Sequence, residues 1–233
     1  MCFLQAPGGL RRKVANALSR RRVRCMTIMN NAAGRQPVLL VDVMDTLVVD
    51  PFTVSMYEHF GFTEHEDFLT AKDPDTWIPF ELGNMSEDRF WNNFFKDKRK
   101  VDVEKFGSYM RETYSWVDGM EDLMSELHSM GAEMHLFTNY PVWWKMVEEE
   151  LYLSKYAEWS FISCQMHARK PEPEAFLLAA DCLGCLPSDC VLIDDRSSNC
   201  AGALDIGYLD ALKFQSAKQT RQLLRKYFPT LTE

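Results

Sequence analysis

Short apolar runs alternate with helical patterns from residue 38 onward. Runs rich in β-branched and aromatic residues predict strands at 38–43, 133–138, 160–163, 190–194 and, more weakly, 208–214. Apolar positions at helical spacing predict helices at 120–130, 142–151, 174–183, 199–206 and 217–227. Strands separated by helices of this length form a parallel sheet with helices on both faces. The pattern predicts a doubly wound, Rossmann-like α/β core.

Residues 52–115 interrupt this alternation. They show helical patterns at 54–60, 86–95 and 103–113 and no convincing strand. Ser86 has the side chain of a helix N-cap, and acidic residues follow it in the first turn. We interpret 52–115 as an inserted helical cap, which leaves 37–51 and 116–233 as the α/β core.

The charge is distributed unevenly along the chain. The first 41 residues hold eight of the 26 basic residues and no acidic residue, so the rest carries 18 basic and 34 acidic residues, a net charge of −16. An acidic surface of this kind repels nucleic acid. No apolar run approaches the roughly 20 residues that cross a bilayer, so we expect no membrane span.

The basic leader has two interpretations. An apolar start, many arginines and no acidic residue are typical of an organellar transit peptide, and they also suit a disordered basic arm. We favour a transit peptide over residues 1–36, because the basic stretch stops where the first strand pattern begins. Its composition leaves chloroplast and mitochondrion both open.

Polar residues occur where four of the predicted strands end. They are Asp42 in the first strand, Thr138 and Asn139 after the second, Lys170 after the third, and Asp194 and Asp195 after the fourth. Open parallel sheets bind ligands at the carboxyl ends of their strands. Each residue alone is more often a cap, a turn or a surface residue. Together, in chain order at strand ends, they predict one shared site.

These residue types meet the needs of phosphoryl transfer. Asp42 can attack phosphorus and form an aspartyl-phosphate. Asp194 can join Asp42 in holding Mg2+, a hard cation that prefers oxygen ligands. Thr138 can bind one phosphate oxygen through its hydroxyl and the backbone N–H beyond it, and Lys170 can neutralise another. We expect Asn139, which follows Thr138, to bind substrate. We therefore expect Mg2+ as the cofactor and a small phosphorylated molecule as the substrate.

Segments 39–47, 136–139, 169–171 and 191–196 resemble the four ordered motifs of the haloacid dehalogenase-like hydrolases. The inserted helices come after the first motif, where that family carries its cap. The resemblance implies a phosphatase in which Asp42 is the nucleophile. It also implies that the backbone carbonyl of Met44 is a metal ligand and that Asp195 supports the metal shell.

A closer resemblance is to the flavin mononucleotide (FMN) hydrolases of plant chloroplasts, a branch of the same family. It rests on segments 41–52, 137–143 and 193–196, and on the cap stretch 77–84. The resemblance implies hydrolysis of FMN to riboflavin and phosphate in the chloroplast.

One position departs from the family pattern. Most phosphatases of this family have a second Asp two residues after the nucleophile, where it protonates the leaving group, and this chain has Met44 there. Such a group typically contributes about 10²-fold to 10⁴-fold to the rate. The neighbouring Asp45 is expected to point elsewhere, which leaves water, a substrate group or a cap residue such as Glu81 as the proton source.

Aromatic residues give a clue to the substrate. Trp77 and Phe80 in the cap, and Trp143 after the second strand, can border the site and stack on a flat ring, with Tyr140 and Trp144 as further candidates. FMN is therefore the preferred substrate. A sugar phosphate is the alternative with the same chemistry, and Met44 keeps open a third possibility, a non-catalytic binding protein on a decayed hydrolase fold.

Overall fold

The computed structural model describes residues 36–232, so 1–35 of the predicted leader lie outside the described residues. Five strands in the described part form one parallel sheet in the order β3-β2-β1-β4-β5. The strands are β1 (Val38–Val41), β2 (Met134–Thr138), β3 (Glu158–Ile162), β4 (Cys190–Asp194) and β5 (Asp210–Lys213). The predicted doubly wound α/β fold is confirmed, with each strand within a few residues of its predicted position.

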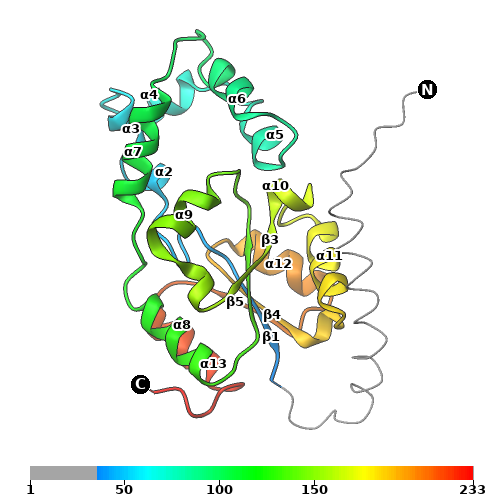
Figure 1. Cartoon of the computed structure of the whole chain (residues 1–233). Coiled ribbons are helices and arrows are strands. Elements are labelled where there is room, and N and C mark those ends of the chain that lie inside the picture. Colours follow the sequence, from blue (N-terminus) through cyan, green and yellow to red (C-terminus); the bar gives the residue numbers. More distant parts are fainter. Residues whose placement is uncertain (1–35, 233) are drawn as a thin grey trace, which may run out of the picture.

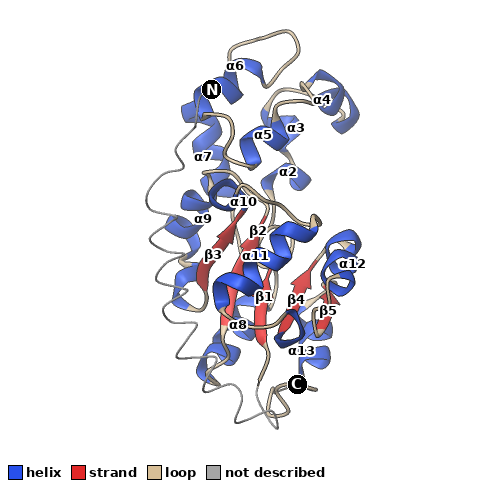
Figure 2. Ribbon diagram, turned by 90° about the vertical axis from the view of Figure 1, so that its right-hand side faces the viewer, coloured by secondary structure: helices blue, strands red, loops and turns tan. Residues whose placement is uncertain are grey.

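Helices cover both faces of this sheet (Figures 1 and 2). One face carries α8 (Met120–Ser129), α9 (Trp144–Leu151) and α13 (Ala217–Leu224), and the other carries α11 (Pro173–Leu183) and α12 (Ser197–Asp205). Side chains alternate along β1, so that Leu39 and Val41 pack with the first group and Leu40 with the second. The strands are apolar on both sides because both sides are buried.

The helices of residues 51–113 lie beyond the carboxyl ends of the strands (Figure 1). They are α2 (Pro51–Val54), α3 (Met56–His59), α4 (His65–Ala71), α5 (Trp77–Glu81), α6 (Glu87–Asn93) and α7 (Val103–Thr113). Ser86 caps α6 by accepting a hydrogen bond from the backbone N–H of Arg89, as predicted. The sequence patterns missed α4, which buries only Phe68, and α5, which is five residues long and contains Pro79.

Three short elements complete the described fold. They are α10 (Ser163–Met166) and the 3-10 helices η1 (Leu153–Lys155) and η2 (Pro187–Asp189). No helix in residues 36–232 is long and apolar enough to cross a membrane.

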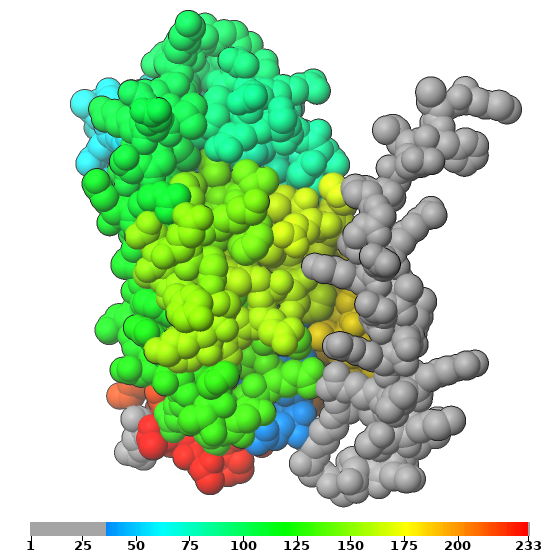
Figure 3. Space-filling view, in the orientation of Figure 1, coloured from blue at the N-terminus to red at the C-terminus, as the bar shows by residue number. Residues whose placement is uncertain are grey.

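Aromatic side chains join the inserted helices to the sheet. Phe80 stacks on Phe90, with ring centroids 4.2 Å apart, and Trp143 at the start of α9 packs against both rings. This cluster is continuous with the apolar core under α8 and α13. In the space-filling view the atoms of 52–115, cyan to green, lie directly on those of the sheet layer (Figure 3). The inserted helices thus share one hydrophobic core with the sheet.

The end of α5 docks on the segment after β3. The hydroxyl of Ser163 donates a hydrogen bond to the carbonyl of Glu81 at 2.7 Å, and the Nδ1 atom of His167 lies 2.8 Å from the carbonyl oxygen of Leu82. Gly83 follows with φ +70°, and a Cβ atom there would lie 2.3 Å from the carbonyl oxygen of Cys164. Only a residue without a side chain allows this approach.

Alanine at Gly83 should therefore be more costly than alanine at Gly61, which has φ +78° but no atom within 4 Å of the added Cβ. The left-handed conformation alone costs roughly 1–2 kcal/mol, which is our expectation for Gly61→Ala. Gly83→Ala adds the overlap with Cys164, so its loss in the free energy of unfolding should be clearly larger. Urea unfolding of both variants measures the difference. Equal losses would show that α5 does not dock as described.

Candidate active site

A buried ammonium group lies at the centre of the site. The Nζ atom of Lys170 donates hydrogen bonds to Asp42 at 2.8 Å, to Asp194 at 2.6 Å and to the carbonyl of Phe137 at 2.6 Å. The side chains of Lys170 and Asp194 are fully buried, and that of Asp42 is 8% exposed. Residues from three separate parts of the chain therefore meet at one cation, as the strand-end pattern predicted.

Charge and burial act in opposite directions on this cluster. Burial raises the pKa of Asp42 to about 7, although Lys170 acts to lower it and Asp194 adds to the rise. Burial alone would lower the pKa of Lys170, but the carboxylates of Asp194 and Asp42 outweigh it and raise that pKa. Lys170 is therefore held as a cation. A bound cation would act against the effect of burial on Asp42 and favour its ionised form.

The metal site predicted from sequence has the required carboxylates close together. One carboxylate oxygen from each of Asp42, Asp194 and Asp195 lies within 4.8 Å of the others. Oxygen ligands of this kind suit Mg2+. Asp194 is oriented by the side-chain amide of Asn199 at 2.9 Å and by the backbone N–H of Arg196 at 2.9 Å. The donor set fits a hard divalent cation.

Thr138 presents an unused polar group beside these acids. Its hydroxyl oxygen is buried and has no hydrogen-bond partner within residues 36–232. A buried hydroxyl without a partner costs free energy, so such groups often mark the place of a ligand. Thr138 lines the same pocket as Asp42 and Lys170, as predicted.

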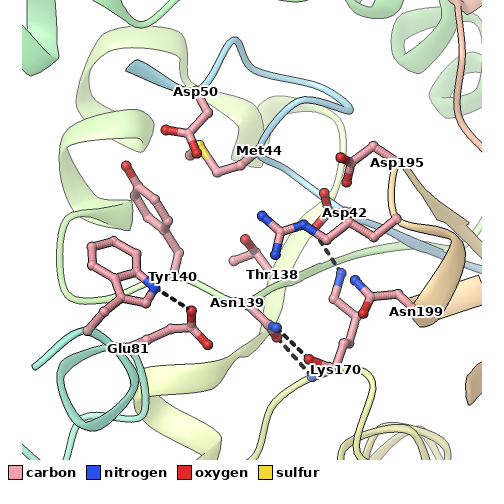
Figure 4. A pocket seen from close by; sticks show the side chains of 12 residues that line it. Asp42, Met44, Asp50, Glu81, Thr138, Asn139, Tyr140, Lys170, Asp195 and Asn199 are labelled. Carbon is pink, nitrogen blue, oxygen red and sulfur yellow. Dashed lines mark hydrogen bonds and ion pairs between the residues drawn. The ribbon is translucent and has the colours of Figure 1, made fainter. Parts of the chain in front are cut away.

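Figure 4 shows this pocket, which encloses about 430 Å³ including its opening to solvent. Its walls hold the predicted residues Asp42, Met44, Thr138, Asn139, Lys170, Asp195 and Trp77, together with Asp50, Glu81, Tyr140, Arg196 and Asn199. Acids and bases therefore converge in a hollow at the carboxyl end of the sheet.

Met44 and Asp45 point in different directions. Met44 is buried and lines the pocket. Asp45 has φ 56°, and its carboxylate accepts hydrogen bonds from the backbone of Asp50 at 3.0 Å and the hydroxyl of Thr53 at 3.2 Å. Asp45 thus fixes the start of α2 and is not among the residues that line the pocket.

The polar groups of Asn139 are paired with the backbone of Lys170. Its side-chain amide donates to the carbonyl of Lys170 at 2.7 Å and its oxygen accepts from the backbone N–H of Lys170 at 2.9 Å. This reciprocal pair positions the lysine backbone. Asn139 lines the pocket, but its polar groups are engaged by Lys170.

The predicted aromatic residues divide into two groups. Phe80 and Trp143 are 1% and 3% exposed, and the indole N–H of Trp143 donates to Glu87 at 2.6 Å, so both belong to the hydrophobic core and not to the pocket wall. Trp77 lines the pocket, as does Tyr140, whose hydroxyl lies 2.9 Å from that of Tyr114. Helical spacing in the sequence could not tell which of these aromatic residues line the pocket and which belong to the hydrophobic core.

Glu81 brings the inserted helices into the site. Its carboxylate accepts hydrogen bonds from the indole N–H of Trp77 at 2.8 Å and from Arg169 at 2.7 Å. Arg169 precedes Lys170 in the chain, so this ion pair ties α5 to the loop that supplies the central cation. Glu81 lies in the pocket, but both of its oxygens already accept a hydrogen bond.

Three pocket residues were missed by the sequence reasoning. Asn199 lies in the first turn of α12, five residues after Asp194, a spacing that a helix after the fourth strand could have suggested. Arg196 immediately follows the acidic pair. Asp50 precedes Pro51 and caps α2, a common pairing at helix starts. In the sequence these three residues look like ordinary polar residues, and only their position next to the strand ends shows that they line the pocket.

Comparison with known proteins finds similarity to a family model, to sequence relatives and to solved structures. Residues 42–207 match the sequence model of the family described as haloacid dehalogenase-like hydrolase. The chain is 43% identical, over 78% of its length and 73% of the relative's, to flavin mononucleotide hydrolase 1, chloroplastic, from Arabidopsis thaliana.

Solved structures show the same fold. An enzyme of the haloacid dehalogenase family from Bacteroides thetaiotaomicron, in complex with magnesium and inorganic phosphate, aligns with a TM-score of 0.67 at 20% identity, covering 82% of this chain and 100% of the other. A phosphatase of that family from Thermococcus onnurineus aligns with a TM-score of 0.57 at 18% identity, covering 81% and 97%.

Asp50 makes stability depend on pH in a defined direction. Burial raises the pKa of its carboxyl from 3.8 to about 6. Between these values the unfolded chain releases a proton that the folded chain keeps, so stability falls as pH rises through this window and then levels off. Asp50→Asn keeps a capping side chain and does not titrate.

The variant should therefore gain stability relative to the wild type between pH 4 and 6, by at most about 3 kcal/mol for two pKa units. Urea unfolding across pH 4.5–7.5 measures this difference. Asp118→Asn, at an exposed position, is the matched control and should follow the wild type. A pH-independent difference for Asp50→Asn would contradict the assignment.

Proposed function

Because this chain belongs to the haloacid dehalogenase-like hydrolases and is a phosphatase, we propose that it is a Mg2+-dependent phosphomonoesterase that converts FMN to riboflavin and phosphate. The observation that carries the chemistry is the buried cluster of Lys170, Asp42 and Asp194 beside the unpartnered hydroxyl of Thr138. The choice of FMN rests on the Arabidopsis relative and on the aromatic wall formed by Trp77 and Tyr140.

Asp42 is the nucleophile in this proposal. Its carboxylate attacks phosphorus, the ester P–O bond breaks, and the phosphoryl group is held as an aspartyl-phosphate until water hydrolyses it. Lys170 keeps a positive charge beside the attacking oxygen, and Thr138 donates its free hydroxyl to a phosphoryl oxygen. The hydrogen bond from Thr46 at 3.1 Å holds the second oxygen of Asp42 in place.

Mg2+ would be held by Asp42, Asp194 and the carbonyl of Met44, with Asp195 supporting them, and when bound it neutralises charge on the phosphoryl oxygens. Asn199 and the backbone of Arg196 orient Asp194 toward this place. The property of the site that fits such an ion is the cluster of carboxylate oxygens from Asp42, Asp194 and Asp195.

Met44 defines how the leaving group obtains its proton. A thioether exchanges no proton, so riboflavin must leave with a proton from water or from an acid elsewhere in the pocket. Glu81 is held by Trp77 and Arg169, which argues against it as the source. We therefore expect slow turnover, since a positioned acid typically contributes about 10²-fold or more.

We also propose that 52–115 act as a cap over a core of 37–51 and 116–233. The support is that α5 supplies two walls of the pocket, Trp77 and Glu81, from outside the sheet layer. A cap of this kind excludes water and selects the leaving group.

The first test is phosphate release from FMN and from glucose 6-phosphate, by protein spanning 37–233, with Mg2+ and with EDTA. Release from FMN should require the metal and fall to background in Asp42→Asn. Asp45→Asn is the matched control, because Asp45 does not line the pocket, and it should stay active. Release from the sugar phosphate alone would keep the chemistry and overturn the flavin assignment, and no release from either ester would overturn both.

A second test concerns location. We propose that 1–36 direct the protein to the chloroplast, which is supported by the basic, acid-free leader and by the chloroplastic Arabidopsis relative. These residues fused to a fluorescent protein should carry it into chloroplasts of leaf cells. A fusion in which the arginines at 20, 21, 22 and 24 are replaced by glutamate should stay outside. Mitochondrial fluorescence would support the alternative organelle.

A further inference from the structure

Arg196 is a cation at the pocket wall that the proposed chemistry does not use. Its backbone N–H is fixed by Asp194, and it caps the start of α12, so its Cα position at the end of β4 is well defined. Its side chain is exposed and lines the same pocket as Asp42, Thr138 and Lys170. Arg196 is therefore a part of the pocket wall that solvent reaches.

This guanidinium group has no ion-pair or hydrogen-bond partner among the side chains of residues 36–232. Its positive charge still affects the pKa values of the carboxyl groups of Asp50 and Asp195. Burial raises the pKa of Asp50 and of Asp195, and the charge of Arg196 acts against both rises. Arg196 thus lies near acids from two walls without forming a salt bridge to either, and its donors remain available.

Lys170, by contrast, has no donor left. An ammonium group carries three hydrogens, and those of Lys170 go to Asp42, Asp194 and the carbonyl of Phe137. Lys170 can contribute charge to a phosphoryl group but no hydrogen bond while these contacts persist. A dianionic phosphate group has three terminal oxygens, so it can accept hydrogen bonds from one more donor beside Thr138 and a metal ion.

We propose that Arg196 supplies this donor and is a substrate-binding residue that clamps the phosphoryl group from the solvent side. The planar guanidinium fork matches two phosphate oxygens, and its charge offsets the acids that surround the pocket. Because the phosphoryl group is common to all esters, the contribution of Arg196 is the same for every leaving group. The inference rests on the phosphatase activity and is independent of the choice of FMN.

The test uses the full chain with Mg2+ and inorganic phosphate as the probe, in calorimetric titrations at constant ionic strength. Arg196→Gln should bind phosphate about tenfold or more weakly than the wild type, the loss expected when charge-assisted hydrogen bonds are removed. Arg196→Lys keeps the charge but not the fork and should recover part of the affinity. Arg89→Gln, at an exposed position on α6 that does not line the pocket, should bind like the wild type.

Steady-state kinetics provide the second measurement. With FMN and p-nitrophenyl phosphate, Arg196→Gln should raise KM by the same factor for both esters. An effect on FMN alone would place Arg196 at the leaving group, and unchanged phosphate affinity would exclude the clamp, so either result overturns the proposal. Phosphate binding that depends on Arg196 in a protein that does not hydrolyse FMN would overturn only the flavin assignment.

Discussion

The structure depends on one buried cation, the ammonium group of Lys170. Burying a charge costs several kcal/mol unless partners compensate, and here Asp42, Asp194 and a backbone carbonyl do so. These partners come from the ends of β1, β2 and β4, while Lys170 comes from the loop after β3. The same contacts that hold Asp42 therefore fix the geometry of four strand ends.

This dependence extends outward through two further contacts. Asn139 holds the backbone of Lys170 on one side, and Arg169, its neighbour in the chain, is paired with Glu81 in α5. The central cation is thus linked to the wall of the pocket that α5 forms. Burial of Glu81 makes that link less screened by solvent than a surface ion pair.

Much of this arrangement was predictable from sequence. Buried parallel strands have continuous apolar runs, so the sheet and its polar ends, including Asp42, Thr138, Lys170 and Asp194, could be located. The exact orientation of aromatic side chains could not, because Phe80 and Trp143 have the same helical spacing whether they face a ligand or a core. Short α5 carried too little pattern to be found, and with it the contact between Glu81 and Arg169 was hidden.

The position of β1 in the middle of the sheet has a consequence for biosynthesis. Leu39 pairs with Met134 on one side and Val191 on the other, so the first of the described strands to be made receives its last neighbour only when most of the chain exists. At ribosomal speed this interval is on the order of ten seconds. Throughout it, an apolar strand edge is open to pairing with other chains, and closing such distant contacts is slow. The strand that leads into Asp42 is therefore the described strand that waits longest for its neighbours during synthesis.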